Sequence, residues 1–235
     1  MSITYKIVDM KPELIDKPIF ITGIERSGNS IIAKALKVCG AFSGHTTSMF
    51  ENKKIKYQLN RYYLDAGLDV RGQFPLPKEI TNFPLDWDLN IKDIIYSEKY
   101  KEDTIWFYKS SKIAQTWKHW LKTFPEAKFI IVRRNSFDIL NSCMKTGFMN
   151  VFNDEEAREN IGAKTIEEAW IWWINYHKDY FDQMLASEMN CKVIWPELLI
   201  RNDFKELKEL IAWVGLEYNR KVELEILNLL KKSKI

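Results

Sequence analysis

This sequence of 235 residues has few cysteines, little excess of one sign of charge, and no long apolar run. The three cysteines, Cys39, Cys143 and Cys191, form no CxxC pair, so we expect buried thiols in a reducing cytosol and no metal site. Basic residues number 35 against 32 acidic ones, which argues against a dedicated nucleic-acid binder. Without a membrane-length apolar run or a signal peptide, we expect no membrane contact and a cytoplasmic location.

The sequence is rich enough in apolar residues, at 46%, to fold as one domain over residues 1–235. Strand patterns occupy residues 18–23, 105–109, 128–133 and 191–195. Helical patterns occupy residues 29–39, 52–64, 166–188, 203–214 and 219–232, and two more helices follow the second and third strands. The stretch from 65 to 90 is poorly patterned, and its prolines predict a loop. This alternation predicts an α/β fold of three layers, with helices on both faces of a mostly parallel central sheet.

The first strand–helix junction has the spacing of a phosphate-binding loop, Gly23-Ile-Glu-Arg-Ser-Gly-Asn-Ser30. Glycines let the backbone curl so that several N–H groups point at one anion, and the helix N-terminus adds its positive end. The loop departs from the nucleotide-triphosphatase pattern because Asn29 stands where a lysine is required, and its cation is Arg26. An anion with less charge than a triphosphate therefore fits better. The alternative is an ordinary glycine turn before a helix.

The third junction reads Val132-Arg-Arg-Asn-Ser-Phe-Asp-Ile-Leu-Asn-Ser142, and here the sequence resembles the PAPS-dependent sulfotransferase family (PAPS is 3′-phosphoadenosine 5′-phosphosulfate). The family signature is a strand ending in Arg-Asn-Pro-x-Asp, with a serine eight residues after the arginine. Arg134 and Ser142 match its arginine and serine, while Ser136 replaces the proline. The resemblance implies that Arg134 and Ser142 bind the 3′-phosphate. We expect Arg133 to pair with a surface carboxylate.

The resemblance extends over most of the chain and is closest to small bacterial sulfotransferases, through Phe50-Glu-Asn, Lys109-Ser-Ser-Lys112 and Trp195-Pro-Glu-Leu198. It implies a P-loop-type fold, PAPS as donor, PAP (3′-phosphoadenosine 5′-phosphate) as product and no required metal. The acceptor would be a hydroxyl or amine of a small molecule or carbohydrate. A late Arg-Lys-Gly motif of many cytosolic members is absent. The residues expected to hold the 5′ end of the donor are Arg26, Ser27, Gly28, Asn29 and Ser30.

Sulfuryl transfer by in-line displacement needs a cation for the bridging oxygen and a base for the acceptor proton. Arg26 is the first candidate for the cation, and Lys109, at the end of the second strand, is the second. Glu51 is the favoured base through its match to the bacterial segment, although a helix N-terminus would lower its pKa. His45 is the alternative base, and Glu51 as a plain helix-start carboxylate is nearly as well supported.

Two rival functions stay open. A P-loop kinase is opposed by Asn29 and by the third strand, which ends in two arginines where an acid for magnesium would be expected. A non-catalytic nucleotide-binding protein of the same fold is kept open by the absent late motif. We expect the aromatic residues along one side of the helix 166–188 to pack in the core; the alternative is that they line an acceptor pocket.

Overall fold

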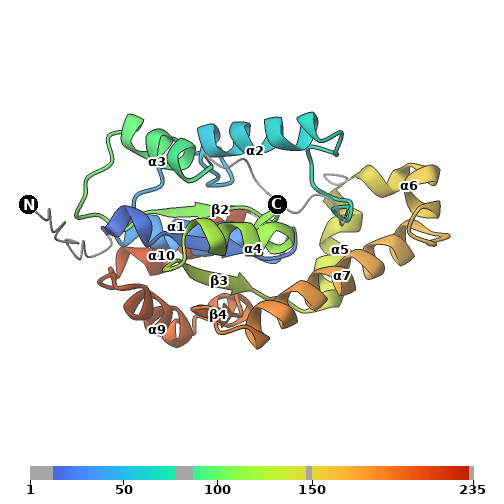
Figure 1. Cartoon of the computed structure of the whole chain (residues 1–235). Coiled ribbons are helices and arrows are strands. Elements are labelled where there is room, and N and C mark those ends of the chain that lie inside the picture. Colours follow the sequence, from blue (N-terminus) through green and yellow to red (C-terminus); the bar gives the residue numbers. More distant parts are fainter. Residues whose placement is uncertain (1–12, 78–86, 147–149, 233–235) are drawn as a thin grey trace, which may run out of the picture.

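The computed structural model describes residues 13–77, 87–146 and 150–232 (Figure 1). Four strands carry the central sheet: β1 (Ile19–Thr22), β2 (Phe107–Lys109), β3 (Lys128–Val132) and β4 (Cys191–Ile194). The helices are α1 (Asn29–Val38), α2 (Lys53–Asp65), α3 (Trp87–Ser97), α4 (Ile113–Thr123), α5 (Ser136–Thr146), α6 (Glu155–Glu159), α7 (Ile166–Ala186), α8 (Glu197–Ile200), α9 (Lys205–Val214) and α10 (Lys221–Lys232). Short 3₁₀ turns lie at Leu14–Asp16 and Asn150–Asn153.

The sheet is parallel throughout, in the order β2-β1-β3-β4. Ile19 of β1 is opposite Phe107 of β2 on one side and Lys128 of β3 on the other. All four strands predicted from the sequence are confirmed. Because parallel strands share one direction, the ends of β1, β2 and β3 bring their following loops to one edge of the sheet.

Alternate strand residues enter two separate cores, which explains why the strands read as continuous apolar runs. Phe20 and Phe129 pack with the buried faces of α2, α3, α4, α5 and α7. Ile19, Ile21 and Ile130 pack with those of α1, α9 and α10 on the opposite face. Figure 1 shows this arrangement of helices around the sheet. The three-layer α/β fold predicted from the sequence is therefore confirmed.

Two sequence predictions need correction. The loop predicted up to residue 90 ends earlier, because α3 begins at Trp87 and buries Trp87, Ile91 and Ile95 at intervals of four residues; residues 78–86 lie outside the described part. The cysteines are free, but Cys143 alone is buried, while Cys39 and Cys191 are half-buried.

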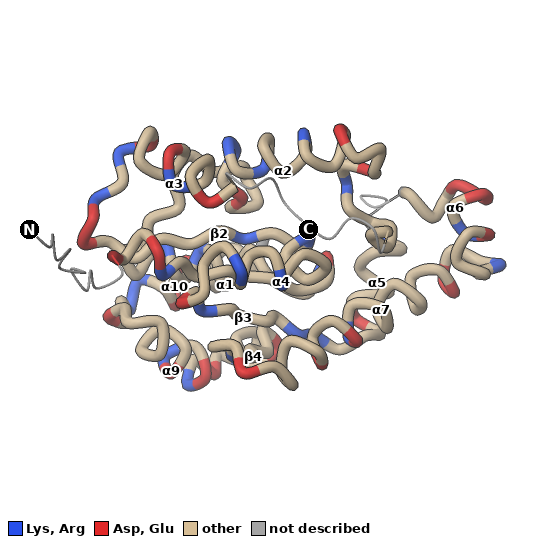
Figure 2. The backbone as a smooth tube through the Cα atoms, in the orientation of Figure 1, with Lys and Arg blue, Asp and Glu red and all other residues tan. Residues whose placement is uncertain are grey.

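Charges of both signs are spread over the helices in the view of Figure 2, although α1 and α4 contain lysines and no acidic residue. In the described segments, no helix combines the length and the apolar character that crossing a membrane requires. Within the same segments, no group of three His, Cys, Asp or Glu side chains has the arrangement of metal ligands.

Candidate active site

Two residues of the loop after β1 have a left-handed backbone conformation. Gly28, the N-cap of α1, has a φ of 101°, and Arg26 also lies in the left-handed region, at 68°. Gly23 has no room for a side chain, since a Cβ there would come within 2.5 Å of the carbonyl oxygen of Val132. Both glycines are therefore required by the backbone path, and the N–H groups at the start of α1 are available to an anion.

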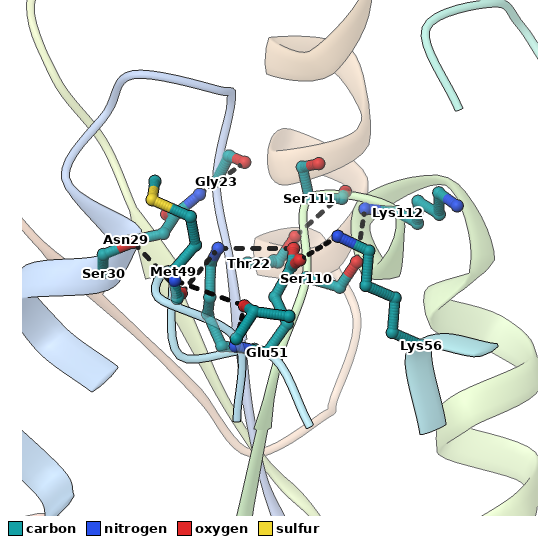
Figure 3. A network of polar contacts seen from close by, with 12 residues as sticks. Thr22, Gly23, Asn29, Ser30, Met49, Glu51, Lys56, Ser110, Ser111 and Lys112 are labelled. Atoms are coloured by element: carbon teal, nitrogen blue, oxygen red, sulfur yellow. Dashed lines mark hydrogen bonds and ion pairs between the residues drawn. The ribbon is translucent and has the colours of Figure 1, made fainter. Parts of the chain in front are cut away.

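Asn29 braces this loop from inside. Its amide nitrogen donates to the carbonyl of Gly23 at 2.9 Å, and its Oδ1 accepts a hydrogen bond from Ser27 Oγ at 3.1 Å. Both Asn29 and Ser27 are buried. The position of the lysine in nucleotide triphosphatases is thus used here for a neutral internal contact. Ser30 is half-buried and donates to the carbonyl of Met49 at 3.2 Å (Figure 3).

The two motifs predicted to bind phosphate meet in space. Arg26 Nε donates to Ser142 Oγ of α5 at 2.9 Å, and Arg134 Nη1 donates to the carbonyl of Arg26 at 2.9 Å. These partners are 116 and 108 positions apart in the sequence. Arg133 turns away from them to Asp182, at 3.2 Å, which confirms its predicted pairing with a surface carboxylate. Two arginines and a serine predicted separately therefore lie together in one hydrogen-bonded cluster.

Glu197 supports the second motif, and the sequence analysis gave it no such role. Its Oε1 accepts the backbone N–H of Asn135 at 2.7 Å, while Asn135 Oδ1 accepts the N–H of Phe137 in the first turn of α5. Beside this turn lies an open cavity of about 370 Å³, whose lining includes Arg134, Phe181 and Trp195. The Trp-Pro-Glu segment after β4 thus supplies both a brace and an aromatic wall.

Glu51 is held between two lysines. Lys109 Nζ lies 3.4 Å from Glu51 Oε1, and Lys56 Nζ lies 2.6 Å from Glu51 Oε2. Figure 3 shows Glu51 and Lys56 within this network. Thr47 Oγ1 shapes the turn by accepting the backbone N–H groups of Met49 and Glu51. The structure therefore brings Glu51 and Lys109 together at the end of β2, next to the segment that contacts Ser30.

The charges in this network shift two pKa values. Burial raises the pKa of Glu51, but the charges and hydrogen bonds of Lys109 and Lys56 outweigh burial, so the net pKa is lowered. Burial lowers the pKa of Lys109 by more than the Glu51 carboxylate raises it. A carboxylate with lowered pKa is a weaker base, which strengthens the objection raised from the sequence.

His45 lies apart from the Glu51 network. Its side chain is 81% exposed, and Nδ1 lies 3.3 Å from Oε1 of Glu98, a carboxylate whose side chain is 1% exposed. Asn52 donates to the other oxygen of Glu98 at 2.6 Å and also caps α2. His45 therefore sits over a buried carboxylate that anchors the segment leading to Glu51.

The loop itself contains a carboxylate, Glu25, to which the sequence assigned no role. Glu25 Oε2 accepts a hydrogen bond from Trp173 Nε1 of α7 at 3.2 Å. Trp173 and Trp170 are buried, so the prediction of a core role holds for both, while Trp172 and Tyr176 are partly buried. The signal that could have drawn attention to Glu25 was an acidic residue inside a loop suited to anions.

The sequence and the fold were also compared with those of known proteins. The sequence model of a family described as the sulfotransferase family matches residues 18–220. No curated protein matches the sequence significantly. The fold is similar to that of sulfotransferase STF9 from Mycobacterium avium, with 13% identity, a TM-score of 0.55, and coverage of 94% of this chain and 69% of that one. It is also similar to the sulfotransferase domain of the Synechococcus PCC 7002 olefin synthase, with 16% identity, a TM-score of 0.51, and coverage of 88% and 75%.

Proposed function

The chain belongs to the sulfotransferase family, and on this premise we propose that it transfers a sulfuryl group from PAPS to a hydroxyl or amine of a small-molecule or carbohydrate acceptor. The observation that carries the proposal is the meeting of Arg26, Arg134 and Ser142 beside the loop. PAPS has two separate anionic ends, and this site offers the N–H groups at the start of α1 together with the adjoining cluster of Arg26, Arg134 and Ser142.

The residues present fit such a donor. The N–H groups at the start of α1, with Gly28 and Ser30, suit the 5′-phosphosulfate, and Asn29 and Ser27 keep the loop in shape from inside. Arg134 and Ser142 suit the 3′-phosphate, since arginine offers a planar fork to phosphate oxygens. The cavity lined by Phe181 and Trp195 offers aromatic surface on which the adenine can stack.

For the chemical step, the acceptor oxygen attacks sulfur while the bond from sulfur to the bridging oxygen breaks, and the electron pair stays on PAP. Arg26 and Lys109 are the cations proposed to stabilise the charge on that oxygen. Glu51, which is proposed from the sequence as the base, is also suited to holding Lys109 in place. His45 is the weaker candidate, because it contacts Glu98 and lies apart from the network of Glu51 and Lys109.

The test compares ligands by thermal unfolding and calorimetry. With EDTA present, PAP at 100 times its Kd should stabilise the folded chain by about 2.7 kcal/mol, because it binds the folded state alone. ATP with magnesium at the same concentration as PAP should stabilise the folded chain much less, since no lysine stands at position 29. A stabilisation by ATP with magnesium that equals or exceeds that by PAP would contradict the proposal and favour the kinase alternative. Turnover of labelled PAPS separates an enzyme from a non-catalytic binding protein.

A further inference from the structure

An acidic residue occupies the phosphate-binding loop directly before Arg26. A carboxylate beside a bound phosphosulfate adds like-charge repulsion, which weakens donor binding. Glu25 is half-buried, so its side chain is neither fully exposed to solvent nor part of the core. Its position therefore calls for a physical explanation that the donor-binding role of the loop does not provide.

The Glu25 carboxylate is held by a hydrogen bond from a residue of α7. The indole N–H of Trp173 donates to Glu25 Oε2 at 3.2 Å. Trp173 is fully buried, and its ring stacks on those of Trp172 and Tyr176, with interplanar angles of 25° and 20°. A ring packed in this way has little rotational freedom, so the carboxylate that it holds is preorganised.

Glu25 shares its surroundings with the proposed catalytic cation. Burial lowers the pKa of both Lys109 and Lys112, and the Glu25 charge is among the influences that oppose this lowering. On the α7 side, burial lowers the pKa of His177, and the Glu25 charge again opposes it. Glu25 thus lies within electrostatic reach of the end of β2, where sulfuryl transfer is proposed.

The two carboxylates differ in how their oxygens are occupied. Each oxygen of Glu51 contacts a lysine ammonium group. Within the described residues, Glu25 accepts one hydrogen bond, from a neutral indole, on Oε2, and its Oε1 has no hydrogen-bond partner. A carboxylate oxygen with free lone pairs can accept a proton, whereas one held by ammonium groups resists protonation. The geometry therefore favours Glu25 over Glu51 for proton removal.

Resting on the proposed sulfotransferase function, we infer that Glu25 is the general base, and that its Oε1 accepts the proton of an acceptor hydroxyl. The acceptor oxygen forms its bond to sulfur and loses its proton to Glu25. The bond between sulfur and the bridging oxygen breaks, and its electron pair leaves with PAP. Glu25 then returns the proton to water. Glu51 keeps Lys109 in place, and Trp173 acts as a positioning residue.

The experiment uses the full chain and the variants Glu25→Gln, Glu51→Gln and Trp173→Phe, with water, phenol or 4-nitrophenol as probe acceptor. Glutamine keeps the size of Glu25 and an oxygen for the indole, but it cannot take the proton. PAP release from PAPS with water or phenol should fall by about 10²- to 10⁴-fold in Glu25→Gln. The loss should be much smaller with 4-nitrophenol, which ionises without a base. PAP affinity by calorimetry should stay equal or tighten, since a negative charge is removed.

The matched variant Glu51→Gln separates the two carboxylates, because it should lower the rate equally for phenol and 4-nitrophenol. Trp173→Phe should lower the phenol rate more than the 4-nitrophenol rate. The inference is overturned if Glu25→Gln keeps the wild-type rate with phenol, if it loses PAP affinity along with all turnover, or if the wild-type chain binds PAP but releases none from PAPS with any probe. A wild-type chain that does not bind PAP refutes the proposed function instead.

Discussion

Arg134→Ala is the most informative substitution in the donor site, because Arg134 has two separable tasks. In the described structure its guanidinium donates to the carbonyl of Arg26 at 2.9 Å, which supports the phosphate-binding loop. In the proposed function the same side chain also binds the 3′-phosphate of PAP. The neighbouring Arg133 provides a comparison, since it is an adjacent arginine that lines the same cavity but pairs with Asp182, whose side chain is 65% exposed.

The expected losses differ for the two tasks. A charge-assisted contact to the 3′-phosphate contributes about 2–4 kcal/mol, so loss of this contact alone should raise the Kd of PAP by about 30- to 1000-fold. The lost support of the loop amounts to one hydrogen bond, about 1 kcal/mol, and every ligand of the loop should feel it. Adenosine 5′-phosphosulfate lacks the 3′-phosphate, so its Kd should rise by about fivefold. Arg133→Ala breaks an exposed ion pair and should change either Kd by less than about fivefold.

Calorimetry with both ligands on wild type and both variants measures these terms. The difference between the two ligands in Arg134→Ala isolates the contact with the 3′-phosphate. Equal weakening of PAP and adenosine 5′-phosphosulfate would show that Arg134 acts through the loop alone. An effect of Arg133→Ala as large as that of Arg134→Ala would refute the assignment of the two arginines.

Three further predictions concern stability and can be checked by urea unfolding. Asn29→Ala removes the internal brace of the loop and should lower the free energy of unfolding by about 1–3 kcal/mol, whereas Ser30→Ala, which loses one half-exposed contact, should lower it by less than about 1 kcal/mol. Gly44→Ala should cost about 2 kcal/mol or more, because φ is +61° and the new Cβ would collide with Glu98; an unchanged stability would contradict the packing described. Burial lowers the pKa of Lys112 to about 8 from its ordinary 10.5, so the folded chain binds fewer protons than the unfolded chain between these values and stability should rise with pH there. Lys112→Met should reduce that rise, and the part that stays in the variant is assigned to other lysines of lowered pKa such as Lys109; an equal rise in the variant would show that Lys112 does not contribute.

The strands and their loops could be predicted because each carries a local signal. The runs 18–23 and 128–133 are continuous and apolar, as strands buried on both faces must be, and each ends in a glycine or arginine motif. The strand order could not be predicted. It depends on which crossover connection places β3 beside β1, and no local pattern in this sequence encodes that choice.

Helix α3 was missed because its signal is weak at both ends. Prolines at 75, 77 and 84 precede it, and residues from 65 onward lack a period, so the stretch was interpreted as a loop. Trp87, Ile91 and Ile95 do recur every four residues and are buried along one side of α3. Three positions in eleven residues are few, and tertiary packing against the core that includes Tyr63 of α2 completes the pattern.

The residue types of the site could be predicted, but their pairings could not. Arg26, Arg134 and Ser142 were found because each belongs to a motif with a fixed spacing. Their mutual contacts join positions more than a hundred residues apart, so they depend on the fold as a whole. The contact between Glu25 and Trp173 joins residues that are even farther apart in the sequence, at a separation of 148 positions. Neither residue occupies a signature position of either motif.

The replacement of the loop lysine by Asn29 changes how positive charge reaches the anion. In a nucleotide triphosphatase, one lysine at the helix start must neutralise a compact group of phosphates. Here that position is neutral and buried, while the cations come from the loop as Arg26, from the end of β2 as Lys109, and from the end of β3 as Arg134. Cations distributed in this way suit a ligand whose anionic groups are separated from each other. They also offset the repulsion between the Glu25 carboxylate and the anionic ligand. In the proposed function, the neutral Asn29 therefore disfavours a triphosphate and is also compatible with a base at Glu25 beside the donor.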